Sequence, residues 1–271
     1  MALARTVRDL PHALDEKVIA PRLAGRRPAV FLDYDGVLTP IVERPEDAVM
    51  SESMRATVRS LAQRVPVCVV SGRDREVVQR LMGVDDLVVA GSHGFDIWSP
   101  TAGTIPHAAA SGFDELIDTV TRRLRTETEG IPGVQIEPKK ASVAVHYRRA
   151  APADRDRVAA IVRQMLTDHP DELKVTPGKM VYELQPKIDW NKGRAVLHLM
   201  DVLGLDSDDV VPLYLGDDIT DEDAFRALPE RGVGILVARP DDPEVAGRTT
   251  AADCALASPE EVEQFLSRLA R

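Results

Sequence analysis

Short, uninterrupted runs of apolar residues recur in the N-terminal and C-terminal parts of the chain. They are Ala29–Leu32, Val65–Val70, Leu87–Ala90, Val210–Leu215 and Gly232–Ala238. Such runs are typical of strands that are buried on both faces of a parallel sheet. Helical patterns, for example at about 52–63 and 192–203, lie between the runs. We therefore expect right-handed strand–helix–strand crossovers and helices on both faces of the sheet.

The middle of the chain, from about 106 to 187, shows a different pattern. Apolar and polar residues alternate strictly over 142–148 and 179–185, next to helical patterns at about 113–128 and 154–168. Strict alternation is typical of an antiparallel sheet with one packed face and one face open to water. The pattern therefore predicts a small α+β domain inserted into a larger one.

The predicted fold class is α/β, with a Rossmann-like parallel sheet core and an inserted α+β cap domain. The expected core comprises residues 1–106 and 187–271, and the expected cap comprises residues 107–186. The open polar face of the cap could cover a site on the core, with hinges near Pro106 and Pro186.

The chain of 271 residues carries a formal net charge of −10. An acidic protein of this kind is a poor candidate for binding a nucleic-acid backbone or an anionic membrane surface. No apolar run approaches the ~18 residues of a membrane span, and the N-terminus lacks an apolar stretch long enough for a signal peptide. We therefore expect a cytoplasmic protein that binds neither nucleic acid nor membrane. An anionic substrate would need a local cationic group or a metal ion.

Polar groups follow three of the apolar runs at the point where each strand should end. Asp33 and Asp35 follow the first run, Ser71-Gly72-Arg73 the second, and an acidic segment from Asp217 to Asp223 the fourth. A further polar segment, Asn191-Lys192-Gly193, stands where a helix should begin. Because ligands of open α/β sheets bind at the carboxyl ends of the strands, we expect these segments to form one site.

The residue types in these segments suit phosphate chemistry. Carboxylates as close as Asp33 and Asp35 repel one another unless a cation lies between them, and oxygen ligands of this kind suit Mg²⁺. The hydroxyl and backbone N–H groups of Ser71-Gly72 could hold a phosphate oxygen. Three of the four segments also have an ordinary structural explanation. The acidic segment could be a solvated loop that caps a helix, Ser71-Gly72 a simple turn, and Lys192 an exposed lysine.

In this order and at these strand ends, the four segments resemble the haloacid dehalogenase superfamily of phosphotransferases. Longer strings resemble trehalose-6-phosphate phosphatases, and the inserted domain resembles the large α/β cap of one branch of the superfamily. The resemblance covers about 28–271 and departs from the usual pattern at Val37, where relatives often carry threonine. The strings are Phe31-Leu-Asp-Tyr-Asp-Gly36, Gly91-Ser-His-Gly94, Lys179-Met-Val-Tyr-Glu-Leu184, Asp189-Trp-Asn-Lys-Gly193 and Gly216-Asp-Asp-Ile-Thr-Asp-Glu-Asp-Ala-Phe225.

The resemblance implies a catalytic role for both carboxylates of the first segment. Asp33 would attack phosphorus and form an aspartyl phosphate. Asp35 would protonate the leaving sugar oxygen and then accept a proton from the water that hydrolyses the intermediate. The two side chains alone do not decide which of them is the nucleophile, so this assignment follows from their places in the motif.

The resemblance also implies how Mg²⁺ and the phosphoryl group are bound. The groups expected to hold Mg²⁺ all come from acidic residues: the Asp33 and Asp217 carboxylates and the Asp35 backbone carbonyl, with Asp218 and Asp221 holding its waters or orienting Lys192. The groups expected to bind the transferring phosphoryl oxygens are Ser71, Gly72 and Lys192, and Lys192 is also expected to act in catalysis.

Polar residues of the inserted domain are expected to bind the sugar. Glu183, Lys179 and Arg148 are the candidates, and charge-assisted hydrogen bonds to hydroxyl groups would support such contacts. His93, in a Gly-Ser-His-Gly turn, is a further candidate for contacting the substrate. The alternative is that the cap residues form exposed ion pairs across strands and that His93 is only a turn residue.

The implied function is Mg²⁺-dependent hydrolysis of trehalose 6-phosphate to trehalose and phosphate, and it suggests a functional pairing with a trehalose-6-phosphate synthase. A phosphatase of the same fold for another sugar phosphate, such as sucrose phosphate or a mannosyl or glucosyl phosphoglycerate, is one alternative. A phosphomutase, which would keep the aspartyl phosphate away from water, is another. The third is a sugar-phosphate sensor without turnover. The intact set of Asp33, Asp35, Lys192 and Asp217 argues against a sensor.

Overall fold

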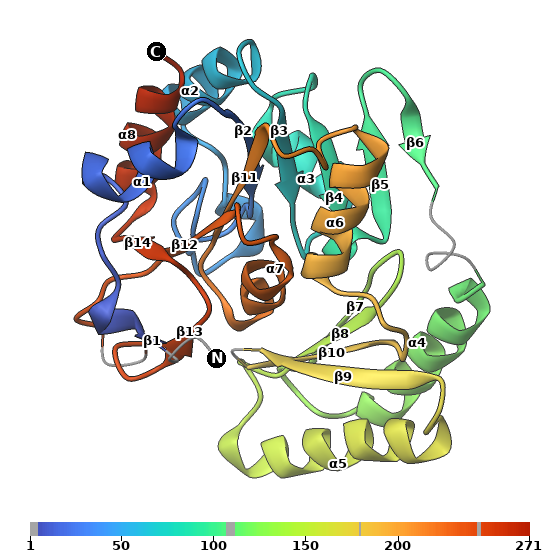
Figure 1. The fold of residues 1–271 in the computed structure, drawn as a ribbon. Coiled ribbons are helices and arrows are strands. Elements are labelled where there is room, and N and C mark those ends of the chain that lie inside the picture. The colour runs from blue at the N-terminus through green and yellow to red at the C-terminus, as the bar shows by residue number, and fades with distance from the viewer. Residues whose placement is uncertain (1–4, 107–111, 179, 243–244) are drawn as a thin grey trace. The chain divides into compact units, whose positions relative to one another are not determined.

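The structure is a computed structural model that describes residues 5–106, 112–178, 180–242 and 245–271. The chain divides into two compact units (Figure 1). The core unit consists of residues 1–105 and 190–271, and the inserted unit consists of residues 106–189. The inserted unit is therefore one continuous stretch, whereas the core unit is assembled from two separate parts of the chain.

The core unit contains, among the described residues, a sheet of eight strands in the order β14-β12-β11-β2-β3-β4-β5-β6. All neighbouring strands from β14 to β4 run parallel, and every residue of β3, β11 and β12 is buried. The α/β core predicted from the apolar runs is therefore confirmed. The strands are β2 Arg27–Leu32, β3 Val67–Val70, β4 Val88–Gly91, β5 Asp96–Ser99, β6 Gly103–Ile105, β11 Val210–Gly216, β12 Val233–Val237 and β14 Cys254–Leu256.

One edge of the sheet departs from the expectation of a wholly parallel arrangement. β5 pairs antiparallel with β4, and β6 pairs antiparallel with β5. These strands are only 4 and 3 residues long, and their sequences mix polar with apolar residues. Neither an apolar run nor strict alternation reveals strands of this kind, so the sequence pattern missed them.

Helices cover both faces of this sheet (Figure 1). α1, α2, α3 and α8 share one apolar cluster with the strands, whereas α7 packs against the other face through Phe225, whose ring lies 5.7 Å from that of Tyr214. No helix in the described part of the chain has the length and apolar character needed to cross a membrane. The helices are α1 Glu16–Leu23, α2 Glu52–Ala62, α3 Arg75–Met82, α6 Lys192–Val202, α7 Glu222–Ala227 and α8 Pro259–Leu269.

The N-terminal segment protects the edge of the sheet at β14. The N–H of Ala13 donates to the carbonyl of Ala255 at 2.8 Å, which adds a short further strand beside β14. β1 Arg5–Thr6 pairs with β13 Thr249–Thr250, and Val7 next to it is fully buried. An exposed strand edge invites pairing with other chains, so this segment has a structural role.

The inserted unit combines a four-stranded antiparallel sheet, in the order β7-β8-β10-β9, with the helices α4 and α5. Val143, Val145 and Leu184 are buried in one cluster with residues of both helices, which leaves the other face of the sheet to polar residues, as the alternation predicts. The elements are α4 Asp114–Thr128, β7 Gln135–Pro138, β8 Val143–His146, α5 Pro152–Asp168, β9 Leu173–Gly178 and β10 Val181–Pro186.

The strands of this unit are shorter than the alternating segments. β8 ends at His146, so Arg148 lies in the turn that follows it. β10 begins at Val181, after Met180, whose φ of 64° is left-handed. Lys179, a candidate for contacting the sugar, lies outside the described residues.

Candidate active site

The carboxyl ends of β2 and β11 bring two carboxylates together. Leu32 and Leu215 are register partners in these neighbouring parallel strands, so the residues that continue the strands lie side by side. The N–H of Asp33 donates to the carbonyl of Leu215 at 2.9 Å, and Asp217 directly follows the last residue of β11. Asp33 and Asp217 therefore share one place at the sheet edge.

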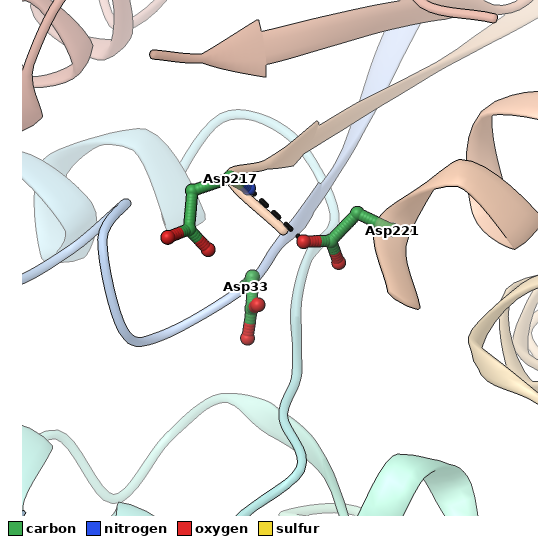
Figure 2. A group of neighbouring side chains, drawn as sticks. All are labelled: Asp33, Asp217 and Asp221. Atoms are coloured by element: carbon green, nitrogen blue, oxygen red, sulfur yellow. Dashed lines mark hydrogen bonds between the residues drawn. The ribbon is translucent and has the colours of Figure 1, made fainter. Parts of the chain in front are cut away.

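Asp221 joins these residues in a group of three carboxylates (Figure 2). Carboxylate oxygens of Asp33, Asp217 and Asp221 lie within 4.8 Å of one another. Asp33 and Asp221 are buried, and Asp217 is partly exposed. The Asp217 carboxylate accepts no hydrogen bond from the residues that the structure describes. Oxygen ligands of this kind are what hard divalent cations take.

Lys192 lies at the first position of α6 and reaches into this group. Its Nζ donates to Oδ2 of Asp33 at 2.6 Å and to Oδ1 of Asp221 at 2.7 Å. The ammonium is buried, although a lysine in the first turn opposes the helix dipole. α6 begins here because Asn191 caps it, with its side chain accepting the N–H of Arg194 at 3.0 Å. The alternative of an exposed Lys192 does not hold.

Asp221 accepts hydrogen bonds at both of its oxygens. Oδ1 accepts from Lys192 and from the hydroxyl of Tyr214 at 2.6 Å. Oδ2 accepts the backbone N–H groups of Asp217 at 3.0 Å and of Asp218 at 2.9 Å. Burial alone would raise the pKa of Asp221, but the charge of Lys192 and these hydrogen bonds lower it below its ordinary value.

The charges of this group do not balance. Burial raises the pKa of Asp33 to about 7, although Lys192 opposes the shift. Burial, and then the charges of Asp33 and Asp221, raise the pKa of Asp217 well above its usual range. Burial would lower the pKa of Lys192, but the two carboxylates beside it raise it. Three carboxylates thus face one ammonium, and a bound cation would relieve the excess negative charge.

Gly36 allows the chain to turn against the carboxylate group. Its φ is +72°, a left-handed value that favours glycine, and a Cβ at this position would collide with the carboxylate of Asp217. Gly216, the last residue of the neighbouring strand β11, also provides space, because a Cβ there would meet the carboxylate of Asp221. Both glycines of the sequence motifs therefore provide space for an acidic side chain.

The Asp35 carboxylate, which is not part of the group of three, is bound by Arg73. Nε of Arg73 donates to Oδ2 of Asp35 and Nη2 donates to Oδ1, both at 2.6 Å. Nη1 of Arg73 donates to the carbonyl of Pro45 at 2.7 Å. Arg73 belongs to the second polar segment of the sequence, but the sequence alone did not predict its partner. The pairing depends on the paths of the loops that follow β2 and β3.

Ser71 and Gly72 follow β3, the neighbour of β2, and are brought next to His93. The carbonyl of Ser71 accepts the N–H of His93 at 2.8 Å, and the Ser71 side chain is buried. A Cβ on Gly72 would lie 2.7 Å from the His93 ring, so the imidazole rests on the predicted phosphate-binding loop. Ser92 and His93 have left-handed φ values of 49° and 56°, which are uncommon for residues other than glycine.

Asp218 lies outside the carboxylate group. It is exposed, and its Oδ1 accepts the N–H of Ile219 at 2.6 Å at the start of a short helical turn, Ile219–Asp221. The Asp218 side chain also accepts the N–H of Asp221, and the Asp221 side chain accepts the N–H of Asp218, which together form a capping box. The acidic segment therefore both caps a helix and supplies buried carboxylates, so its two interpretations do not exclude one another.

Glu183 anchors a polar cluster on the open face of the inserted unit. Its Oε1 accepts from the hydroxyl of Ser142 at 2.7 Å and from Nζ of Lys139 at 3.2 Å. The side chains of Lys139 and Glu183 are 13% and 14% exposed, so this is not the exposed ion pair of the alternative interpretation. His146 pairs nearby with Glu137 at 2.7 Å, and this contact is the first cause of a lowered pKa of Glu137. Lys139 was not predicted as a site residue, because it follows β7, whose sequence shows no strand pattern.

Comparison with known proteins decides the family. A family model described as trehalose-phosphatase matches residues 31–259. The chain belongs to the trehalose-phosphatase family. A trehalose-phosphate phosphatase of Mycobacterium tuberculosis is 42% identical over 268 residues, which cover 98% of this chain and 67% of the relative.

Comparison with solved structures identifies the fold of this member of the trehalose-phosphatase family. The C-terminal domain of Candida albicans trehalose-6-phosphate phosphatase superposes with a TM-score of 0.76 at 26% identity, covering 96% of this chain and 98% of the other. A haloacid dehalogenase-like hydrolase of Bacteroides thetaiotaomicron gives a TM-score of 0.62 at 15% identity, covering 90% and 99%. The predicted haloacid dehalogenase-like fold is confirmed.

Proposed function

We propose that this chain hydrolyses trehalose 6-phosphate to trehalose and phosphate, the last step of trehalose biosynthesis, through an aspartyl phosphate on Asp33. The observation that carries the proposal is the buried arrangement of Lys192 between Asp33 and Asp221, beside Asp217, in a member of the trehalose-phosphatase family. A nucleophile, a cation and a metal-type donor set meet here at the edge of the sheet where ligands bind.

Asp33 is held ready for attack on phosphorus. Its Oδ1 accepts the N–H of Tyr34 at 2.7 Å and its Oδ2 accepts from Lys192, so the carboxylate has one orientation. Hydrolysis of phosphate monoesters requires accelerations of up to ~10²¹-fold. Alignment of the nucleophile contributes ~7–11 kcal/mol, so stabilisation of charge on the phosphoryl oxygens must supply much of the remainder.

Asp35 moves the protons in both steps. In the first step, an oxygen of Asp33 bonds to phosphorus, the bond between phosphorus and the sugar oxygen breaks, and Asp35 gives its proton to that oxygen. In the second step, water attacks phosphorus, its proton passes to Asp35, and the bond to Asp33 breaks. The sum is one water consumed, one trehalose and one phosphate released, with both aspartates restored.

Mg²⁺ is the divalent ion that we propose for this site, held by the carboxylates of Asp33 and Asp217 and by the backbone carbonyl of Asp35. When bound, it would neutralise charge on the transferring phosphoryl group. Lys192 contributes a second positive charge, and Ser71 and Gly72 contribute hydroxyl and N–H donors. The four hydrogen bonds that Asp221 accepts support a role in orienting Lys192, and the capping of the turn that carries Asp221 supports an indirect role for Asp218.

The sugar is proposed to be bound by polar residues of the inserted unit. The cluster of Glu183, Lys139 and Ser142 offers acceptors and donors on the open face of its sheet, which suits sugar hydroxyls. Arg148 and Lys179 remain proposed contacts on this unit. His93 is proposed to contact the substrate from its position on Gly72 of the core unit.

Phosphate release from a panel of sugar phosphates tests the proposal. We expect Mg²⁺-dependent release that is fastest with trehalose 6-phosphate and lost in a folded Asp33→Asn variant. Faster release from sucrose 6-phosphate or from a glycosyl phosphoglycerate would reassign the substrate. A phosphomutase would move phosphate between hydroxyls without releasing it, and a sensor would bind trehalose 6-phosphate without turnover. A confirmed substrate would support the functional pairing with a trehalose-6-phosphate synthase.

A further inference from the structure

The contact between Arg73 and Asp35 fixes the orientation of a carboxylate that has to transfer a proton. Two parallel charge-assisted hydrogen bonds, both of 2.6 Å, define the plane of the carboxylate as well as its position. A lysine in place of Arg73 could supply the charge but not this two-point geometry. Asp33 and Asp35 are thus oriented by different cations, Lys192 for the first and Arg73 for the second.

The structure fixes Arg73 from several sides. Its guanidinium lies 5.9 Å from the centroid of the buried Tyr34 ring and donates to the carbonyl of Pro45 at 2.7 Å. Its backbone N–H donates to Oγ of Ser71 at 3.1 Å, and its carbonyl accepts the N–H of Ser92 at 2.7 Å. Both the side chain and the backbone of Arg73 are therefore set before any substrate arrives.

The turn that holds the backbone of Arg73 is itself strained. Ser92 and His93 both adopt left-handed φ values, of 49° and 56°. The hydroxyl of Ser92 donates to Asp74 at 2.6 Å, and the N–H of His93 donates to the carbonyl of Ser71 at 2.8 Å, which locks the turn. Strained backbone persists where the surrounding structure holds a functional geometry, here that of the loop carrying Arg73.

We propose that Arg73 is a positioning residue that orients Asp35 for proton transfer to the leaving oxygen, an inference that rests on the proposed phosphatase function. In that step an oxygen of Asp33 bonds to phosphorus while the bond between phosphorus and the leaving oxygen breaks, and the electron pair stays on the leaving oxygen. The new O–H bond forms with a proton carried on the lone pair of an Asp35 oxygen that Arg73 does not use, and the Asp35 carboxylate left behind is stabilised by Arg73. A poorly stabilised alkoxide needs this proton, whereas p-nitrophenolate leaves as a stable anion. The effect of Arg73 on the rate therefore grows with the basicity of the leaving oxygen.

Single-turnover cleavage of phenyl phosphate and p-nitrophenyl phosphate tests this without any sugar contact. The release of phenol or p-nitrophenol reports the first step alone. We expect Arg73→Ala to slow the cleavage of phenyl phosphate on the order of 10-fold more than that of p-nitrophenyl phosphate. This is less than the roughly 10²–10⁴-fold of general acid catalysis, because Asp35 itself remains. Arg73→Lys should show the same selectivity for the leaving group. In an Asp35→Asn background, removal of Arg73 should change neither rate by more than about 3-fold, because the two residues act as a unit.

A matched control separates positioning from a general loss of structure. Arg231 is 17% exposed, like Arg73, and pairs with Asp206 at 2.7 Å, while its Nε donates to Val210 at the opposite end of β11. Arg231→Ala should leave the leaving-group dependence unchanged. Equal slowing of both esters by Arg73→Ala, or a raised KM for both without a change in kcat, would assign Arg73 to the phosphoryl group and overturn the proposal. A wild-type protein that cleaves neither ester nor trehalose 6-phosphate would overturn the proposed function as well.

Discussion

At the scale of single residues, Asp221 organises the candidate site. A carboxylate offers about four lone-pair sites, and the donors from Lys192, Tyr214, Asp217 and Asp218 occupy that number. Protein donors thus use the capacity of Asp221, while Asp217 keeps its carboxylate oxygens for other ligands. The same group of acids therefore contains one residue whose oxygens are fully used by protein donors and one, Asp217, whose oxygens accept none from the described residues.

Replacing Asp221 with asparagine should weaken both stability and turnover. In the variant, Asp33 is the remaining carboxylate partner of the buried Lys192 ammonium. The new amide NH₂ group can also face donors that the Asp221 carboxylate accepts, such as the N–H groups of Asp217 and Asp218. Breaking a buried ion pair typically lowers the free energy of unfolding by about 3–5 kcal/mol. We expect a loss near the lower end of this range, because Asp33 still pairs with Lys192. Urea unfolding gives the free energy, and phosphate release gives kcat. Tyr214→Phe, which removes one hydrogen bond at about 1 kcal/mol, is the control. Equal behaviour of both variants would refute the assignment.

At the scale of elements, much of the site could be predicted because burial leaves a clear pattern. β2, β3 and β11 are buried on both faces, so their apolar runs also show where they end, at Asp33, Ser71 and Asp217. Pairings that depend on the paths of loops leave no such pattern. The bond between Arg73 and Asp35 joins residues 38 positions apart, and that between Lys139 and Glu183 joins residues 44 apart.

The N-terminal segment yields a prediction at this scale. Val7 is fully buried beside β1, whereas the next residue, Arg8, is exposed. Val7→Asp should bury an unpaired charge or release the segment, at a cost of at least about 2 kcal/mol, while Arg8→Asp should stay within about 0.5 kcal/mol. Thermal unfolding checks the stability and light scattering checks for aggregation through the uncovered edge of β14. Similar melting of the two variants would show that the segment does not protect the sheet.

The open face of the inserted sheet supports a prediction about specificity. Glu183→Ala should lower kcat/KM for trehalose 6-phosphate by at least about 10-fold, since a charge-assisted hydrogen bond contributes about 1.5–3 kcal/mol. Hydrolysis of p-nitrophenyl phosphate, which lacks a sugar, should remain within about 2-fold of wild type. Glu172→Ala, at a glutamate whose side chain is 62% exposed, is the control. If the substitution lowers kcat/KM equally for both substrates, or for neither, Glu183 does not bind the sugar.

At the scale of the whole molecule, the distribution of charge favours a bound metal ion if the substrate is anionic. The chain has a net charge of −10, and the cations at the site, Lys192 and Arg73, already pair with carboxylates. A phosphate ester that approaches this edge of the sheet meets excess negative charge. A divalent ion bound at the proposed site of Asp33 and Asp217 would reverse the local sign, and would so couple metal binding to both activity and stability.

Stability measurements on an Asp217→Asn variant test this coupling through its sign. In EDTA the variant should melt above wild type, because it removes one charge from a buried group in which burial, and then the charges of Asp33 and Asp221, raise the pKa of Asp217. Mg²⁺ at about 100 times its Kd should then stabilise wild type by about 2.7 kcal/mol and the variant by much less. The order of the two Tm values therefore reverses when metal is added.

Asp223→Asn provides the matched control, since this side chain is 45% exposed on α7 and belongs to the same acidic segment. It should respond to Mg²⁺ as wild type does, because its charge is screened by solvent and does not contribute to the buried group. Thermal unfolding of the three proteins, with and without metal, needs no substrate and is independent of catalysis. Equal stabilisation of all three by Mg²⁺ would place the ion elsewhere, and a metal-free Asp217→Asn that melts well below wild type would mean that Asp217 stabilises the fold without a cation.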